Sequence, residues 1–207
     1  GKSSLLQEFS RRAQQAHDAL LVASGRCDIY TGQGDPYLPF RGVLGLLAGD
    51  VESRWAAGSV TRDQAVRLWS ASPATIEALV QHGPDLLGNF VPIQAVRARL
   101  AATHLGGRVG LQRISEVIER AEHSAADAQP HPNRILEEFT LVLFSLAQRH
   151  PLLLLLDDLQ WIDPSSANLL FHLARRLKNR PILIVGTYRP EDITQLPDGS
   201  PHPLEPV

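Results

Sequence analysis

The sequence lacks several features that would assign it to a class at once. It has a single cysteine, Cys27, so no disulfide can form within the chain, and this composition fits a reducing, cytoplasmic compartment. No apolar run approaches the roughly 20 residues of a transmembrane helix, so we expect no membrane partner. Methionine is absent. We expect the chain to be a piece of a longer protein, which makes the missing signal peptide uninformative.

An excess of charge of one sign is also missing. The 207 residues carry 20 Lys and Arg against 22 Asp and Glu, a net charge of −2. Proteins that bind nucleic acid through its backbone need a basic surface, and this balance supplies no clear nucleic-acid patch. With 43% hydrophobic and 20% charged residues, the composition is that of an ordinary globular domain.

The most informative stretch runs from residue 152 to 163 and reads LLLLLDDLQWID. Five leucines without polar alternation predict a strand covered on both faces, as in a parallel sheet. Asp157 and Asp158 follow at the carboxyl end, where open α/β sheets bind ligands. One interpretation is that the two acids cap the next turn. The other is that they serve a site for a nucleotide and Mg²⁺.

The N-terminus favours the second interpretation. Gly1, Lys2, Ser3 and Ser4 match the end of the phosphate-binding loop G-x-x-x-x-G-K-[ST], and an amphipathic helix is predicted over 3–18 with Leu5, Leu6 and Phe9 on its apolar side. The strand and the earlier glycine of that loop are not in the sequence. The triplet is a weak signal alone and a stronger one together with the acids after the leucine strand.

The remaining pattern is a regular alternation of helices and strands. We predict strands over 19–24 and 182–187, helices over 36–47, over 134–150 and from 164 onward, and loops over 26–34 and 124–133. Asp163 before Pro164 is expected to cap a helix. Residues 50–133 predict short helices and contain no catalytic constellation. Their histidines lack the spacing of a helical metal site, which argues against metal binding there. The order predicts an α/β fold with parallel strand pairing.

Four segments carry a resemblance to a known family: GKSSLL, GRCDIY with PYLPF, LLLLLDDLQWID and ILIVGTYRPED. The chain resembles the nucleotide-binding module of AAA-type, Orc1-like ATPases and their STAND relatives, which occur in large bacterial regulatory proteins. The resemblance implies a three-layer P-loop NTPase fold with sheet order 5-1-4-3-2. Residues 1–207 would form one partial domain that shows strands 2, 3 and 4, with strands 1 and 5 outside the sequence and a helical insertion at about 50–133.

The resemblance also implies roles for the Walker A and Walker B motifs. Gly1, Lys2, Ser3 and Ser4 would bind the phosphates of ATP. Ser3 and Asp157 would hold Mg²⁺, which prefers oxygen ligands.

Three further residues would act in catalysis. Asp158 stands where many AAA-type ATPases have a glutamate that polarises the attacking water. Its side chain is one methylene shorter, which fits proteins that use ATP as a slow switch. Arg189 resembles the arginine that senses the γ-phosphate in STAND proteins, with Thr187 as a polar sensor beside it. Alternatively, Arg189 is a surface arginine after a strand.

These features predict an ATP-binding, slowly hydrolysing switch module in a multidomain signalling protein. Its partners would be ATP or ADP, other domains of the same polypeptide and, depending on nucleotide, further copies of the protein. A nucleotide-binding module without turnover and a DNA-handling Orc1-like protein stay open as alternatives. Because the front of the phosphate loop is not in the sequence, we expect the 207 residues alone to bind ATP poorly.

Overall fold

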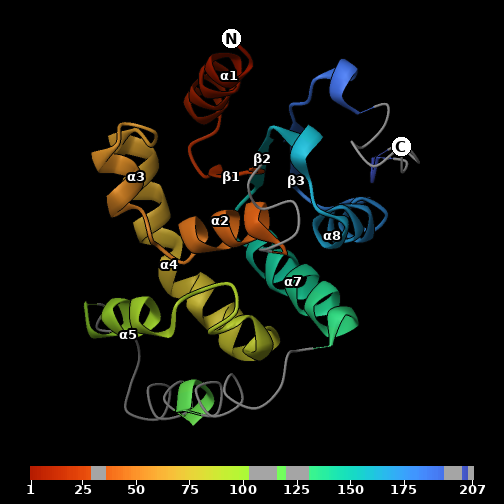
Figure 1. Cartoon of the computed structure of the whole chain (residues 1–207). Coiled ribbons are helices and arrows are strands. Elements are labelled where there is room, and N and C mark those ends of the chain that lie inside the picture. Colours follow the sequence, from red (N-terminus) through yellow and green to blue (C-terminus); the bar gives the residue numbers. More distant parts are fainter. Residues whose placement is uncertain (29–35, 103–115, 120–130, 194–201, 205–207) are drawn as a thin grey trace. The chain divides into compact units, whose positions relative to one another are not determined.

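The structure, a computed structural model, describes residues 1–28, 36–102, 116–119, 131–193 and 202–204 (Figure 1). The chain divides into two compact units. The first contains Gly1–Val43 and Leu152–Val207, and the second contains Leu44–Pro151. The first boundary falls within helix α2 (Leu38–Leu47).

The first unit is built on a parallel sheet of three strands in the order β1-β2-β3. These strands are β1 (Leu21–Arg26), β2 (Leu152–Asp157) and β3 (Ile182–Gly186). The register pairs Leu21 with Leu152 and Leu152 with Ile182, so the three strands end at one edge. The predicted α/β fold with adjacent parallel strands is confirmed. β2 is buried from Leu152 to Leu156, as expected for a central strand with helices on both sides.

Helices cover both faces of this sheet. Helix α1 (Lys2–Ala16) packs on one face, where Leu6 joins Leu20, Val22, Leu153 and Leu155 in a buried cluster. Helix α8 (Pro164–Ala174) lies on the other face (Figure 1). Alternate residues of a strand point to opposite faces, and the unbroken leucines of β2 therefore supply both layers. The result is a three-layer α/β arrangement in the first unit.

Helix α1 packs through a side that matches the predicted one only in part, since Leu6 is buried as expected while Leu5 and Phe9 are not. Leu5 and Phe9 are 72% and 40% exposed, whereas the buried side contains Leu6, Ser10 and Gln14. Burial of these polar residues is compatible with packing because each has a partner nearby. The Ser10 hydroxyl donates to the carbonyl of Gln7. A hydropathy pattern cannot recognise a polar residue whose hydrogen bond is made within its own helix.

The first unit also contains a close contact between β1 and the start of α2. A Cβ atom on Gly25 would lie 1.8 Å from the carbonyl oxygen of Pro39. Tyr37, just before the helix, has φ 67° and is buried. The predicted helix over 36–47 therefore begins two residues later than expected. A larger residue at position 25 would separate the two backbones.

The turns around β3 complete the first unit. They are the 3₁₀ turns η3 (Leu159–Trp161) and η4 (Pro190–Asp192). The predicted cap of α8 is confirmed, because the Asp163 side chain accepts a hydrogen bond from the Ser166 N–H at 2.9 Å.

The second unit is helical. It contains α3 (Glu52–Ala56), α4 (Arg62–His82), η2 (Pro84–Leu86), α5 (Ile93–Ala102) and α7 (Pro132–Ala147). Helices α4 and α7 pack against each other, and their buried residues include Leu68, Ile76, Leu79, Phe139 and Leu143.

The predicted loop over 124–133 is partly wrong. Residues 124–130 lie outside the described part, while Pro132 and Asn133 already belong to α7 because proline suits the first turn of a helix. Of the loop predicted over 26–34, residues 29–34 lie outside the described part and Arg26 ends β1. Among the described residues, no helix is long and apolar enough to cross a membrane.

Candidate functional site

The centre of the candidate site is Asp157, the last residue of β2. The backbone of β1 holds the strand in place up to this point, because the Cys27 N–H donates to the Asp157 carbonyl at 3.0 Å. After five buried leucines, the Asp157 side chain is the first that is partly exposed. A partly buried carboxylate needs hydrogen-bond donors or a cation, and both can reach Asp157 at this strand end.

Two hydroxyl groups from distant parts of the sequence meet the Asp157 carboxylate. Ser3 Oγ donates to Oδ2 at 2.7 Å, and Thr187 Oγ1 donates to Oδ1. Ser3 lies in the first turn of α1, and Thr187 follows β3. The structure therefore brings together three residues that are far apart in the sequence and that were expected to serve one nucleotide site.

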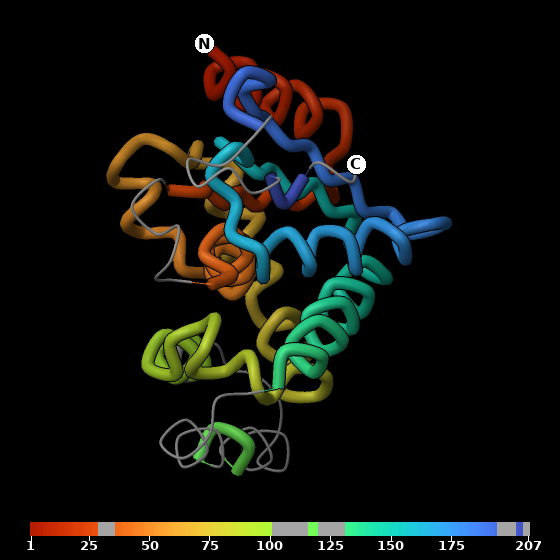
Figure 2. The backbone as a smooth tube through the Cα atoms, turned by 45° about the vertical axis from the view of Figure 1, so that its right-hand side comes forward, coloured from red at the N-terminus to blue at the C-terminus, as the bar shows by residue number. Residues whose placement is uncertain are grey.

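Lys2 lies beside this group. Its Nζ donates to the carbonyl of Tyr188 at 3.2 Å, which ties the start of α1 to the segment after β3 (Figure 2). Gly1 is the N-cap residue of α1, no described side chain caps the helix, and Ser4 is exposed. The first N–H groups of a helix are ready donors for an anion such as phosphate.

Asp158 differs from its neighbour in conformation. Its backbone is left-handed, with φ 59° and ψ 45°, rather than continuing the strand. Aspartate tolerates this conformation better than most residues. The turn lets the Asp158 N–H donate to Asp157 Oδ1 and to Thr187 Oγ1, both at 3.2 Å.

The Asp158 side chain is held by two residues that the sequence analysis did not assign. Arg26 Nε and Nη2 both lie 3.0 Å from Oδ2. Gln160 Nε2 donates to Oδ1 at 3.1 Å. The register could have indicated Arg26, because it pairs with Asp157 at the ends of β1 and β2. Gln160 belongs to the turn η3, whose conformation no sequence periodicity predicts.

Arg189 is not part of this network. Its side chain is exposed and forms no hydrogen bond or ion pair with the described residues. Its connection to the site runs along the chain, since it follows Tyr188, the residue whose carbonyl binds Lys2.

Cys27, the single cysteine, is close to these acids and is unreactive. Burial and the neighbouring carboxylates of Asp163, Asp158 and Asp157 raise the pKa of Cys27 to about 12. The thiol therefore stays protonated at neutral pH and is not a nucleophile.

The residues at the strand end fit a divalent metal bound together with phosphate. Ser3 Oγ and Asp157 Oδ2 are two oxygen donors in direct contact, and Mg²⁺ is typically bound by one or two protein oxygens plus phosphate oxygens and water. No group of three or more His, Cys, Asp or Glu residues that could hold a metal occurs in the part described.

A comparison with protein families agrees with this geometry. The model of a family described as AAA ATPase domain matches residues 1–185. The chain belongs to this family. AAA domains bind nucleotide, usually with Mg²⁺, and the oxygen donors of this AAA domain suit that combination. Comparisons with curated proteins and with solved structures found no match.

Proposed function

We propose that this AAA domain binds ATP with Mg²⁺ at the group Ser3–Asp157–Thr187 and hydrolyses it slowly, as a switch within a larger regulatory protein. The observation that carries the proposal is the hydrogen bond of 2.7 Å between Ser3 and Asp157, residues 154 positions apart in the sequence. Ser3 is exposed and Asp157 is partly exposed, so their contact is not part of the apolar core. Both are oxygen donors for a hard cation.

The roles follow from the chemistry of each group. Lys2 places a positive charge next to the first turn of α1 and would hold the β- and γ-phosphates, together with the N–H groups of Gly1 to Ser4. Ser3 and Asp157 would hold Mg²⁺, which when bound neutralises charge on the phosphate oxygens. Thr187 orients the Asp157 carboxylate and stands close enough to act as a polar sensor.

Asp158 and Arg189 complete the proposed catalytic group. Asp158 would orient the attacking water, as an acid half-buried at the same strand end as Asp157. Arg189, exposed and without a partner among the described residues, is free to swing toward a γ-phosphate. Its present separation from the site fits a residue that responds to nucleotide rather than one that is fixed in place.

A second candidate function is nucleotide binding without turnover. It is favoured by the contacts of Arg26 and Gln160 with both oxygens of Asp158. In this arrangement the carboxylate already has three donors, and orienting a water would require at least one of them to move. Turnover of the full-length protein separates the two candidates.

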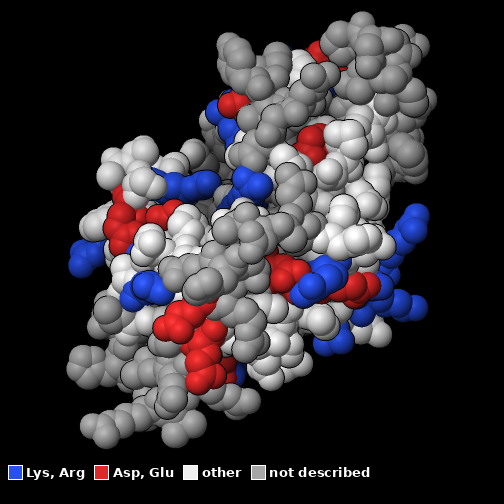
Figure 3. Space-filling model, turned by 60° about the horizontal axis from the view of Figure 1, so that its bottom comes forward, with Lys and Arg blue, Asp and Glu red and all other residues white. Residues whose placement is uncertain are grey.

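A DNA-handling role receives less support. On the face in Figure 3, the described basic side chains stand in small groups next to acidic ones. The net charge of −2 agrees with this distribution. A salt-dependent DNA titration of the full-length protein would test this alternative.

The proposal is tested by removing the lysine charge. Lys2→Ala in the full-length protein should weaken Mg-ATP binding by at least about 100-fold, or about 2.7 kcal/mol. Lys178→Ala is the matched control, because Lys178 is exposed after α8, and it should bind as wild type does. Isothermal titration measures both. Wild-type affinity in Lys2→Ala would refute the phosphate site.

A further inference from the structure

His202 is buried against the turn that follows the acids. It is 1% exposed, and its Nε2 lies 3.0 Å from the carbonyl oxygen of Gln160. The Leu204 N–H donates to its Nδ1 at 3.1 Å. Because Nδ1 accepts, the proton of a neutral ring is on Nε2, which donates to Gln160. Both ring nitrogens are therefore used, one for the local turn and one for contact with η3.

Gln160 links this histidine to Asp158. Its side chain is 2% exposed and its Nε2 donates to Asp158 Oδ1. Its other amide atom, Oε1, is buried and has no hydrogen-bond partner among the described residues. An unsatisfied buried oxygen destabilises the fold, so the amide is poorly explained by stability alone. The hydrogen bond to Asp158 is the contact that explains a buried amide at this position.

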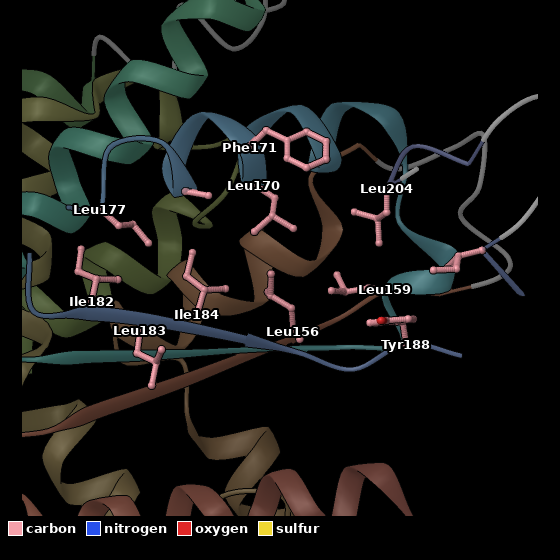
Figure 4. Close-up of a pocket in the computed structure, with 13 residues that line it drawn as sticks. Leu156, Leu159, Leu170, Phe171, Leu177, Ile182, Leu183, Ile184, Tyr188 and Leu204 are labelled. Carbon is pink, nitrogen blue, oxygen red and sulfur yellow. The ribbon is translucent and has the colours of Figure 1, made fainter. Parts of the chain in front are cut away.

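Two contacts with other parts of the chain hold the turn η3. On one side the Leu159 N–H donates to the Thr187 carbonyl at 2.8 Å, and Leu159 packs so closely that a Cβ on Gly186 would lie 2.3 Å from it. On the other side His202 binds the carbonyl of Gln160. Leu204 and Leu159 both line the apolar pocket between β3 and α8 (Figure 4). The segment His202–Leu204 thus binds the turn through a hydrogen bond and lines the same pocket.

We propose that His202 is a positioning residue for Asp158 and acts on it through Gln160. This inference rests on the proposed role of Asp158 in orienting water. The segment His202–Leu204 follows β3 in the chain and contains none of the proposed nucleotide-binding residues. A displacement of this segment would release the Gln160 carbonyl, shift the amide and change the position of the acid. The segment His202–Leu204 thereby controls the rate of hydrolysis without touching nucleotide.

A matched pair of substitutions separates positioning from packing. Glutamine at position 202 has an N–H donor at the same distance along the side chain as Nε2 and can still reach Gln160. Asparagine has an oxygen at the place of Nδ1, which keeps the local bond to Leu204 but falls short of Gln160. We expect His202→Asn to lower kcat for Mg-ATP about tenfold with KM changed less than twofold. His202→Gln should stay within about threefold of wild-type kcat.

The first control is His131→Asn, an exposed position at the start of α7, which should change neither kcat nor KM. The second is Gln160→Ala, which should lower kcat as His202→Asn does, and the double variant should lose no more than either single variant. Thermal melting of each full-length protein identifies any variant that fails to fold. Equal kcat values for His202→Asn and wild type, or losses that multiply in the double variant, would overturn the inference.

A measurement that does not need turnover completes the test. The side-chain amide resonance of Gln160, observed after selective ¹⁵N-glutamine labelling, should move in Asp158→Asn and move in the same direction in His202→Asn. An unchanged resonance in His202→Asn would also overturn the inference. If the wild-type protein binds Mg-ATP without hydrolysing it, the proposed ATPase function fails and the effect of His202 on rate fails with it. Normal turnover that is insensitive to His202→Asn refutes the inference alone.

Discussion

Each unit contains one pair of carboxylates close to donors, and the two pairs are held in different ways. In the first unit, Asp157 accepts from the hydroxyls of Ser3 and Thr187 and, at 3.2 Å, from the backbone N–H of Asp158. In the second unit, Glu138 Oε2 accepts from the backbone N–H of Asp85 at 2.9 Å, and Arg134 bridges Glu138 and the Asp85 carboxylate. Hydroxyls can rotate and can give up a carboxylate to a cation, whereas a backbone N–H in a turn is fixed.

The difference indicates which acid is structural and which is available for chemistry. Glu138 is 9% exposed and joins α7 to η2 within a packed helical unit. Asp157 lies at a strand end, and its Ser3 partner is an exposed residue in the first turn of a helix. Glu138, buried and held by a backbone N–H and by Arg134, anchors the fold. Asp157 can exchange the hydroxyl of the exposed Ser3 for a ligand.

The largest effect is expected for the acid of the proposed metal site. Asp157→Asn should weaken magnesium-dependent ATP binding by about 100-fold, because it removes the charged oxygen ligand. Glu138→Gln makes the same chemical change in the second unit and should alter affinity by less than about threefold. Titration with Mg-ATP and with ATP plus a chelator measures both. Similar losses from the two variants would remove the contrast between the acids.

The next effect separates the two neighbouring acids. Asp158→Asn should lower kcat by about 100-fold, in the range of a lost general base, while Mg-ATP affinity stays within about threefold. Steady-state hydrolysis and equilibrium binding by the full-length protein give the two numbers. If Asp158→Asn lost Mg-ATP affinity but kept the kcat of wild type, the roles assigned to Asp157 and Asp158 would be reversed.

A smaller effect is expected on stability. The side chain of Arg26 is 75% exposed in its ion pair with Asp158, and exposed pairs contribute about 0–1 kcal/mol. Arg26→Gln should therefore lower the free energy of unfolding by less than about 1 kcal/mol in urea titrations. A loss above about 2 kcal/mol would mean that Asp158 is anchored as firmly as Glu138.

The smallest effect concerns pH. Burial, with the nearby Asp85 carboxylate, raises the pKa of Glu138 above 4.5, although Arg134 and the Asp85 N–H oppose the shift. The folded state thus holds this proton more tightly than the unfolded state. Its stabilising contribution is complete below pH 4.5 and is lost as the pH rises through the folded pKa.

Urea titrations between pH 4 and 7 test this sign. Wild type should lose stability relative to Glu138→Gln as the pH rises, by less than about 1 kcal/mol. If wild type instead lost stability relative to Glu138→Gln as the pH falls, the interaction with Arg134 would outweigh burial.

Several elements were predictable because their signals are local. The leucine run predicted β2, the apolar segment after residue 181 predicted β3, and Asp163 before Pro164 predicted the cap of α8. Local signals failed where packing decides. The exposed Leu5 and Phe9 of α1 show that a periodic stripe predicts a helix but not which side of it is buried.

The sequence by itself determined the chemical types at the candidate site: a lysine and a serine at a helix start, two acids after a buried strand, and a threonine after the next. Tertiary structure decided which of these meet. Parallel register brings the ends of β1, β2 and β3 to one edge, which places Arg26 near Asp158 and Thr187 against Asp157. The left-handed turn at Asp158 and the contact of His202 with Gln160 depend on contacts between residues far apart in the chain. Residues distant in the sequence stabilise this turn and this contact, so a local sequence pattern cannot predict them.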